Sequence, residues 1–185
     1  MTTSLTIIGL GYVGLPLANE ACRSGLAVTG LDTDSSVVAG LMSSVSHIDD
    51  IDSTGVAEML AAGFNATTDS TCIGNSDVII ICVPTPLDDD GTPDLSAVKA
   101  ATRTVSEHLQ PGSLVVLEST TYPGTTEDTV KPLLEEWSGL TAGVDFNLAY
   151  SPERIDPGNP EWGLRNTPKI VGGLTPACTE QAIQF

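Results

Sequence analysis

The sequence predicts an α/β fold of the Rossmann type: a doubly wound, mainly parallel sheet with helices on both faces. Strand-like apolar runs alternate with helix-like stretches along the 185 residues. A glycine-rich turn separates the first run from the first helix. The strongest run, residues 78–83, has six apolar residues without alternation, which is typical of a parallel strand buried on both faces. Repeated strand–helix–strand units form doubly wound sheets with right-handed crossovers.

The individual elements follow from apolar runs and from breaks at proline and glycine. Further strands are expected at residues 5–9, 27–32, 65–67, 114–117, 147–150 and 169–171. Helices are expected from the glycine turn to residue 23 and over residues 35–42, 54–62, 95–109, 124–137 and 175–185. Asp94 is predicted to cap the helix that follows it, because its carboxylate can accept a hydrogen bond from a free main-chain N–H. A threonine hydroxyl at Thr125 or Thr126 is expected to cap the next helix, so neither residue is assigned a chemical role.

Composition narrows the class of protein. The chain is assigned to one domain, residues 1–185, with 41% hydrophobic residues and only 4% aromatic ones. Seven Lys and Arg face 24 Asp and Glu, a net charge of −17, which argues against nucleic-acid and anionic-membrane partners. Without a signal segment or an apolar run of membrane-spanning length, a cytoplasmic protein is expected. No CxxC pair is present, and no metal site is predicted.

Residues 9–14 read Gly-Leu-Gly-Tyr-Val-Gly, a G-x-G-x-x-G string. The string follows a predicted strand and opens a predicted helix, which is the setting of a dinucleotide-binding turn. Gly9 would permit the tight turn, Gly11 the approach of a pyrophosphate, and Gly14 close packing of helix on strand. The helix N-terminus would supply main-chain N–H donors and a partial positive charge. The alternative is a glycine turn that merely joins a strand to a helix.

An acidic residue stands where the second strand ends. Asp32 comes 18 positions after Gly14, and its carboxylate would accept hydrogen bonds from the adenosine ribose hydroxyls. A 2′-phosphate there would meet Asp32 and the nearby Asp34, with no Arg beside them. The sequence therefore favours NAD over NADP as cofactor.

Three loops follow predicted strands, at the sheet edge where open α/β folds bind ligands. They are residues 82–86 (CVPTP), 118–126 (ESTTYPGTT) and 151–159 (SPERIDPGN). With GLGYVGLP at 9–16 and PKIVGG at 168–173, these strings resemble the UDP-glucose/GDP-mannose dehydrogenase family over about residues 5–179. They look most like the branch that acts on UDP-N-acetylhexosamines. UDP-glucose members typically carry a second Glu four places after the one matching Glu153, where this chain has Pro157.

The resemblance implies a four-electron oxidation of a sugar C6 alcohol to a carboxylate by two NAD+, in polysaccharide biosynthesis. The family's catalytic cysteine forms a thiohemiacetal and then a thioester, and it lies in a GFGGxC-like segment that these residues do not contain. The middle dimerisation helix and the C-terminal UDP-sugar domain of the family also lack counterparts. The chain is therefore expected to be an N-terminal NAD-binding domain, inactive by itself and monomeric. The complete protein would bind a UDP-sugar and form a homodimer or a larger assembly.

The resemblance also implies cofactor contacts. Tyr12 and Val13 match positions that contact the cofactor through their main chain, and Thr85 matches a cofactor contact after the fourth strand. The hydroxyls of Thr120 and Thr121 could donate to the nicotinamide ribose or hold the catalytic water, and Thr120 is chosen as the cofactor contact. Tyr12 could instead cap the pocket or pack on a neighbouring loop. Thr85, between two prolines, could instead belong to a rigid turn with no ligand role.

Catalytic and substrate-binding positions carry over in the same way. Thr121 matches a threonine near C6 of the sugar. Glu153 matches an active-site glutamate linked to the activation of water, the work of a general base. Arg154 and Ile155 match residues that line the sugar-nucleotide site. Glu153 could instead be a surface carboxylate paired with Arg154, and Arg154 could simply hold the loop.

Two functions of other kinds remain alternatives. One is a stand-alone dinucleotide-binding or regulatory module without catalysis. The other is a different enzyme with the same cofactor turn, such as a 3-hydroxyacid dehydrogenase, against which the strings at 118–126 and 151–159 argue. Within the resembled family, UDP-glucose is the alternative substrate.

Overall fold

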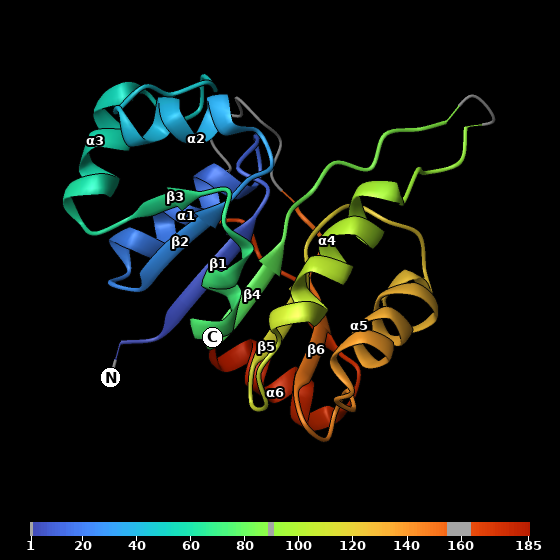
Figure 1. Ribbon diagram of the computed structural model, residues 1–185. Coiled ribbons are helices and arrows are strands. Elements are labelled where there is room, and N and C mark those ends of the chain that lie inside the picture. Colours follow the sequence, from blue (N-terminus) through green and yellow to red (C-terminus); the bar gives the residue numbers. More distant parts are fainter. Residues whose placement is uncertain (1, 89–90, 155–163) are drawn as a thin grey trace.

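A seven-stranded sheet forms the centre of the computed structural model, which describes residues 2–88, 91–154 and 164–185. The strand order is β3-β2-β1-β4-β5-β6-β7 (Figure 1). Strands β1 to β6 pair in parallel and β7 is antiparallel to β6. The strands are β1 (Ser4–Ile8), β2 (Ala27–Leu31), β3 (Asn65–Thr67), β4 (Val78–Ile81), β5 (Leu114–Leu117), β6 (Asn147–Tyr150) and β7 (Gly172–Gly173). The predicted doubly wound, mainly parallel fold is confirmed.

Helices cover both faces of this sheet (Figure 1). The α-helices are α1 (Gly14–Arg23), α2 (Ser35–Met42), α3 (Ser53–Ala61), α4 (Ser96–His108), α5 (Lys131–Ser138) and α6 (Pro176–Gln184). A 3₁₀-helix, η1 (Ser70–Asn75), precedes β4, and a π-helical segment, η2 (Thr125–Val130), leads into α5. Among the described residues, no helix combines the length and apolar character needed to cross a membrane.

The buried strand β4 shows why its sequence has no polar alternation. Val78 and Ile80 pack in the hydrophobic cluster that contains residues of α1 and α3, whereas Ile79 and Ile81 pack in the cluster of α4 and α5. Successive side chains of a strand point to opposite faces, so a strand covered on both faces must be apolar throughout. Burial of each such side chain contributes about 2 kcal/mol.

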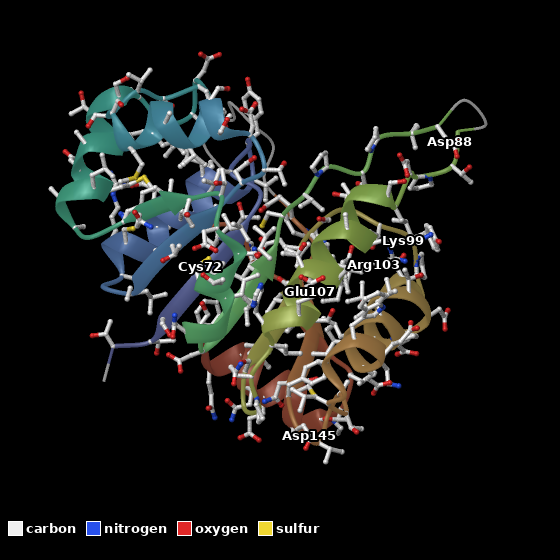
Figure 2. All side chains as sticks on the ribbon, viewed as in Figure 1. Cys72, Asp88, Lys99, Arg103, Glu107 and Asp145 are labelled. Carbon is white, nitrogen blue, oxygen red and sulfur yellow. The ribbon has the colours of Figure 1, made fainter. Side chains whose placement is uncertain are left out.

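The helices α4 and α5 lie side by side on one face. Figure 2 labels Lys99, Arg103 and Glu107 along α4. The Arg103 guanidinium lies 5.7 Å from the centre of the Trp137 ring on α5, a cation–π contact. Between β4 and α4 the chain forms an extended arm, with Asp88 labelled near its end in Figure 2.

The strand order reverses between β1 and β4, which are neighbours in the sheet. From β1 the chain first builds outward to β2 and β3, and then returns to build β4, β5 and β6 on the other side. Loops therefore diverge at the carboxyl ends of β1 and β4 and leave a crevice between them.

Most predicted elements agree with the structure within two residues at each end. The strand predicted at 169–171 is wrong: pairing begins at Gly172, opposite Tyr150, and is antiparallel. The side chain of Lys169 instead forms an ion pair with Glu118. Strand β4 ends at Ile81, two residues before the predicted end at 83.

Two predicted helix starts also differ. Helix α4 begins at Ser96, and Asp94 Oδ1 accepts the Ser96 N–H at 2.8 Å, so the predicted bond forms just outside the helix. No side chain caps the N-terminus of η2 with a hydrogen bond. Thr125 Oγ1 donates to the Tyr122 carbonyl at 2.8 Å, and the preceding Gly124 has φ 94°. The expected threonine cap is therefore wrong, because a left-handed glycine reverses the chain there.

Candidate functional site

A pocket of about 1010 Å³ lies along the carboxyl edge of the sheet. Residues at or just beyond the ends of β1, β2, β4, β5 and β6 line it, with part of α4 as a further wall. We call it the strand-end pocket. It lies at the point where the strand order reverses, and its volume is at the upper end of the range for small-molecule and cofactor sites.

Most of the predicted site residues line the strand-end pocket. They are Gly9, Gly11, Tyr12, Val13, Asp32, Thr85, Thr120 and Glu153. Among the described residues, Gly14, Thr121 and Arg154 are outside its lining. Gly14 is buried at the start of α1, Thr121 is half-buried next to Thr120, and Arg154 is exposed next to Glu153. Ile155 lies outside the described residues.

The three glycines of the turn differ in what surrounds them. A Cβ on Gly9 would lie 2.7 Å from the Cys82 carbonyl oxygen, and Gly9 has φ +90°. A Cβ on Gly14 would lie 1.8 Å from the Gly9 carbonyl oxygen. A Cβ on Gly11 would meet nothing within 4 Å, although Gly11 lines the pocket. The chain's own packing therefore requires Gly9 and Gly14, whereas Gly11 leaves open space where a ligand can approach the main chain.

The N-terminus of α1 adjoins this open space. Helix α1 begins at Gly14 after Val13, no side chain caps it, and its first turn contains no acidic residue. The N-terminus of a helix carries partial positive charge. In α1 the Leu15 N–H already donates to the Gly11 carbonyl oxygen at 3.1 Å and Pro16 has no N–H. Because Gly11, Tyr12 and Val13 line the pocket, an anion there would meet the positive end of α1 and the main chain of the glycine turn.

Asp32 is fixed beside the glycine turn. Its Oδ2 accepts the Leu10 N–H at 2.8 Å and its Oδ1 accepts the Asp34 N–H at 2.9 Å. Each carboxylate oxygen can accept more than one hydrogen bond, so Asp32 retains acceptor capacity toward the pocket. Asp34 caps α2, and hydrogen bonds from the hydroxyl and main-chain N–H of Ser36 lower the pKa of its carboxyl.

The charged side chains of the lining are almost all acidic. They are Asp32, Asp34, Glu118 and Glu153, and the lining also contains His47. Among the described residues, no Lys or Arg belongs to the lining. A diphosphate bound here would therefore rely on main-chain donors, and an additional phosphate near Asp32 and Asp34 would be repelled.

Hydroxyl groups join the loops that follow β4 and β5. Thr85 Oγ1 donates to the Thr120 carbonyl oxygen at 2.6 Å. Ser119 Oγ donates to the Val83 carbonyl oxygen at 2.7 Å. The Thr85 hydroxyl proton is thus used within the protein, and its oxygen faces a ligand only as an acceptor. These bonds set the relative position of the two loops at the pocket.

Glu118 and Lys169 form an ion pair that the sequence did not single out as part of a site. The Glu118 side chain is 2% exposed and its Oε1 pairs with Lys169 Nζ. Burial raises the pKa of Glu118 to about 7, against the opposing effect of Lys169. Glu118 could have been predicted as a site residue, because it is a carboxylate directly after a buried strand. Lys169 belongs to the PKIVGG string, but no local pattern predicts its contact with Glu118, which is 51 positions away.

Glu153 lies after β6 and is half-buried in the pocket wall. Its Oε1 accepts the main-chain N–H of Arg154 at 2.6 Å. The Glu153 carboxyl group also lines the pocket with Glu118, and it helps to raise the pKa of Glu118. The predicted catalytic candidate therefore sits beside a second carboxyl group at the sheet edge.

Comparisons with known proteins agree with this geometry. A family model described as the NAD-binding domain of the UDP-glucose/GDP-mannose dehydrogenase family matches residues 3–185. The chain is 43% identical over 174 residues to a UDP-N-acetyl-D-mannosamine dehydrogenase of Pyrococcus horikoshii, covering 92% of this chain. It is 36% identical over 176 residues to a UDP-N-acetyl-D-glucosamine 6-dehydrogenase of Pseudomonas aeruginosa, covering 95% of this chain. The chain spans 41% of the length of each relative.

A solved structure of a relative has the same fold as this chain. The UDP-D-ManNAc dehydrogenase from Pyrococcus horikoshii superposes with a TM-score of 0.92 at 40% sequence identity. The match covers 98% of this chain and 44% of that protein. The described fold is therefore that of the N-terminal part of a longer relative.

Proposed function

The chain belongs to the UDP-glucose/GDP-mannose dehydrogenase family, as its NAD-binding domain, and from this premise we propose that the strand-end pocket holds NAD+ for a nucleotide-sugar 6-dehydrogenase. The proposed position of the cofactor rests on one observation. Gly11 lacks a side chain at a position where the protein itself has room for one. That room lies beside the N-terminus of α1, where a diphosphate gains most from main-chain donors.

Other residues of the pocket fit the rest of the cofactor. The Asp32 carboxylate, held by the Leu10 N–H, would accept hydrogen bonds from the adenosine ribose. Tyr12 and Val13 would contact the diphosphate through their main chain. Thr85 and Thr120 would position the nicotinamide half, because both line the pocket after β4 and β5. NAD+, when bound, supplies the acceptance of a hydride, and the chain's residues orient it.

For the complete protein we propose oxidation of the C6 alcohol of a UDP-N-acetylhexosamine to the carboxylate. The relatives that support this choice are named for N-acetylated UDP-sugars. Pro157 stands where UDP-glucose members typically have a second glutamate. Glu153 would take a proton from water, Thr121 would lie near C6, and Arg154 and Ile155 would contact the sugar nucleotide.

Steady-state kinetics of the complete protein test this proposal. We expect two NADH per UDP-N-acetylhexosamine oxidised, and a lower kcat/KM with UDP-glucose. Glu153→Gln should lower kcat by at least about a hundredfold, the usual contribution of a general base. Glu127→Gln, an exposed change on η2, is the control and should retain activity. Absence of NADH formation with every UDP-sugar would contradict the enzymatic proposal.

A further inference from the structure

Two side-chain hydroxyls continue the ladder between β4 and β5 beyond the ends of these strands. The register pairs Ile81 with Leu117, and the Glu118 N–H donates to the Ile81 carbonyl oxygen at 2.9 Å. The bonds of a parallel ladder are evenly spaced, so the next rung, two residues further along, would use the carbonyl oxygens of Val83 and Thr120. Side-chain hydroxyls donate to both of these oxygens.

The two hydroxyl bonds run in opposite directions between the loops. Ser119 Oγ, in the loop after β5, donates to the Val83 carbonyl oxygen at 2.7 Å. Thr85 Oγ1, in the loop after β4, donates to the Thr120 carbonyl oxygen at 2.6 Å. We call Ser119 and Thr85 the hydroxyl pair. Because each loop supplies one donor and one acceptor, a shift of either loop relative to the other would disturb both bonds.

The surroundings of the hydroxyl pair make both bonds hard to replace. Ser119 is 5% exposed, so removal of its hydroxyl would leave a partly buried carbonyl oxygen of Val83 without this donor, at a cost in free energy. Thr85 is half-buried between the exposed Pro84 and Pro86. Prolines fix the main chain and supply no N–H, so the Thr85 hydroxyl is an important donor of its loop.

The hydroxyl pair lies in the part of the strand-end pocket that is remote from Asp32. Val83, Thr85, Ser119 and Thr120 all line the pocket. In the strand order β2-β1-β4-β5, the glycine turn after β1 lies between Asp32 and these two loops. A cofactor with its diphosphate at the glycine turn and its adenosine at Asp32 would therefore extend its nicotinamide half toward the hydroxyl pair.

We propose that Ser119 and Thr85 are positioning residues that act as one unit and hold the loops after β4 and β5 at the separation that the nicotinamide half of NAD+ requires. The inference rests on the proposed function, which places the cofactor in this pocket. Both hydroxyl protons are used within the protein, so neither residue needs to donate to the cofactor. Loops that are already in place need not be ordered when the cofactor binds, which favours affinity. The adenosine half should not depend on the hydroxyl pair.

Calorimetric titration of the chain with NAD+ and with ADP tests the proposal, because ADP has the adenosine and the diphosphate but lacks the nicotinamide half. Thr85→Val keeps the shape of the side chain without its hydroxyl. It should bind NAD+ about tenfold more weakly and ADP as the wild type does. Thr85→Ser keeps the hydroxyl and should bind both ligands like the wild type. Ser138→Ala is the control, because it removes a hydroxyl that donates to the Leu134 carbonyl oxygen at 2.6 Å, outside the pocket lining.

Ser119→Ala and the double variant with Thr85→Val test whether the pair acts as one unit. Ser119→Ala should show the same selective loss, and the double variant should lose about tenfold rather than about a hundredfold, because either single change already releases the loops. Thr85→Val and Thr85→Ser alone decide the matter if Ser119→Ala does not fold.

Three results would overturn the positioning role. They are NAD+ binding by the single variants that equals that of the wild type, an equal loss of NAD+ and ADP affinity, and single losses that multiply in the double variant. Failure of the wild type to bind NAD+ is a different result, since it would contradict the proposed function itself and the positioning role with it.

Discussion

Individual hydrogen-bonding atoms determine what the carboxyl edge of this sheet can bind. The carboxylate of Asp32 accepts hydrogen bonds from two main-chain N–H groups, one of them in the glycine turn. This placement links the shape of the turn to the acid that would face the ribose. The role of Asp32 was predictable from the spacing in the sequence, because an acidic residue at the end of the second strand, about 20 positions after the glycine string, indicates dinucleotide binding. The hydrogen bond from the Leu10 N–H to its carboxylate was not predictable, because that bond depends on the folded geometry of the turn.

The Asp32 carboxylate should determine the preference for NAD+ over NADP+. Asp32→Asn keeps one carbonyl oxygen as an acceptor but removes the negative charge that would repel a 2′-phosphate. We expect the ratio of the NADP+ to NAD+ dissociation constants to fall about tenfold, equivalent to about 1.4 kcal/mol. Calorimetric titration with both cofactors measures the ratio. Asp52→Asn, at the cap of α3 and outside the pocket lining, is the control, and an equal change there would contradict the assignment.

Glu118 should impose a characteristic pH dependence on stability. Its pKa in the folded chain is raised to about 7 from a usual value of 4.5, so the folded state binds more protons than the unfolded state between these values. The free energy of unfolding should therefore fall as pH rises through this range, by on the order of 3 kcal/mol from this group. Below the usual value both states are protonated and the contribution is flat.

Urea unfolding between about pH 5 and 8 tests this dependence against a matched pair of variants. Glu118→Gln should show a clearly shallower fall than the wild type. Glu135→Gln should keep the wild-type slope, because a hydrogen bond from Lys131 lowers the pKa of Glu135 and moves its titration to more acid pH. A Glu118→Gln variant with the wild-type slope would show that Glu118 titrates normally.

Between β1 and α1, the elements approach so closely that only glycine fits. The Cβ of an alanine at position 14 would lie 1.8 Å from the Gly9 carbonyl oxygen. We expect Gly14→Ala to lower the free energy of unfolding by roughly 3 kcal/mol, since the contact is with main chain that has little freedom to move. Chemical denaturation followed by circular dichroism measures the change.

Gly40→Ala is the control within another helix. Gly40 lies in the interior of α2, and an added Cβ there meets its nearest atom at an ordinary 3.5 Å. Alanine should stabilise this helix by about 0.5–1 kcal/mol. If Gly14→Ala and Gly40→Ala had the same effect on stability, the close contact of β1 and α1 would not be the reason for glycine at position 14.

The elements also show which features of the fold the sequence could predict. Strands β4 and β5 were predictable because burial on both faces requires continuous apolar residues. Strand β7 was not, because its two residues are both glycine and carry no apolar pattern. Nor was η2, whose start depends on the left-handed conformation of Gly124. Local patterns identify elements that bury their own side chains, and they miss those fixed by contacts from elsewhere.

In the molecule as a whole, the site combines predictable loops with an unpredictable ion pair. The loops after β1, β4, β5 and β6 each carry a distinctive string, and the parallel sheet brings their starting points to one edge. Lys169 contacts this edge through its ion pair with Glu118, although no local sequence pattern predicts that these two residues form a pair. The acidic character of the molecule, with a net charge of −17, extends into the pocket and leaves anion binding to the main chain.

Calorimetric titration of NAD+ into the wild type, Gly11→Ala and Gly74→Ala tests the central claim most directly. A Cβ on Gly74 would lie 3.6 Å from the His108 carbonyl oxygen, an ordinary contact outside the pocket lining. Gly74→Ala should therefore bind NAD+ like the wild type. Gly11→Ala should keep the wild-type melting temperature but bind NAD+ at least about tenfold more weakly. Undiminished NAD+ binding by Gly11→Ala would contradict the proposal that the cofactor's diphosphate lies against this turn.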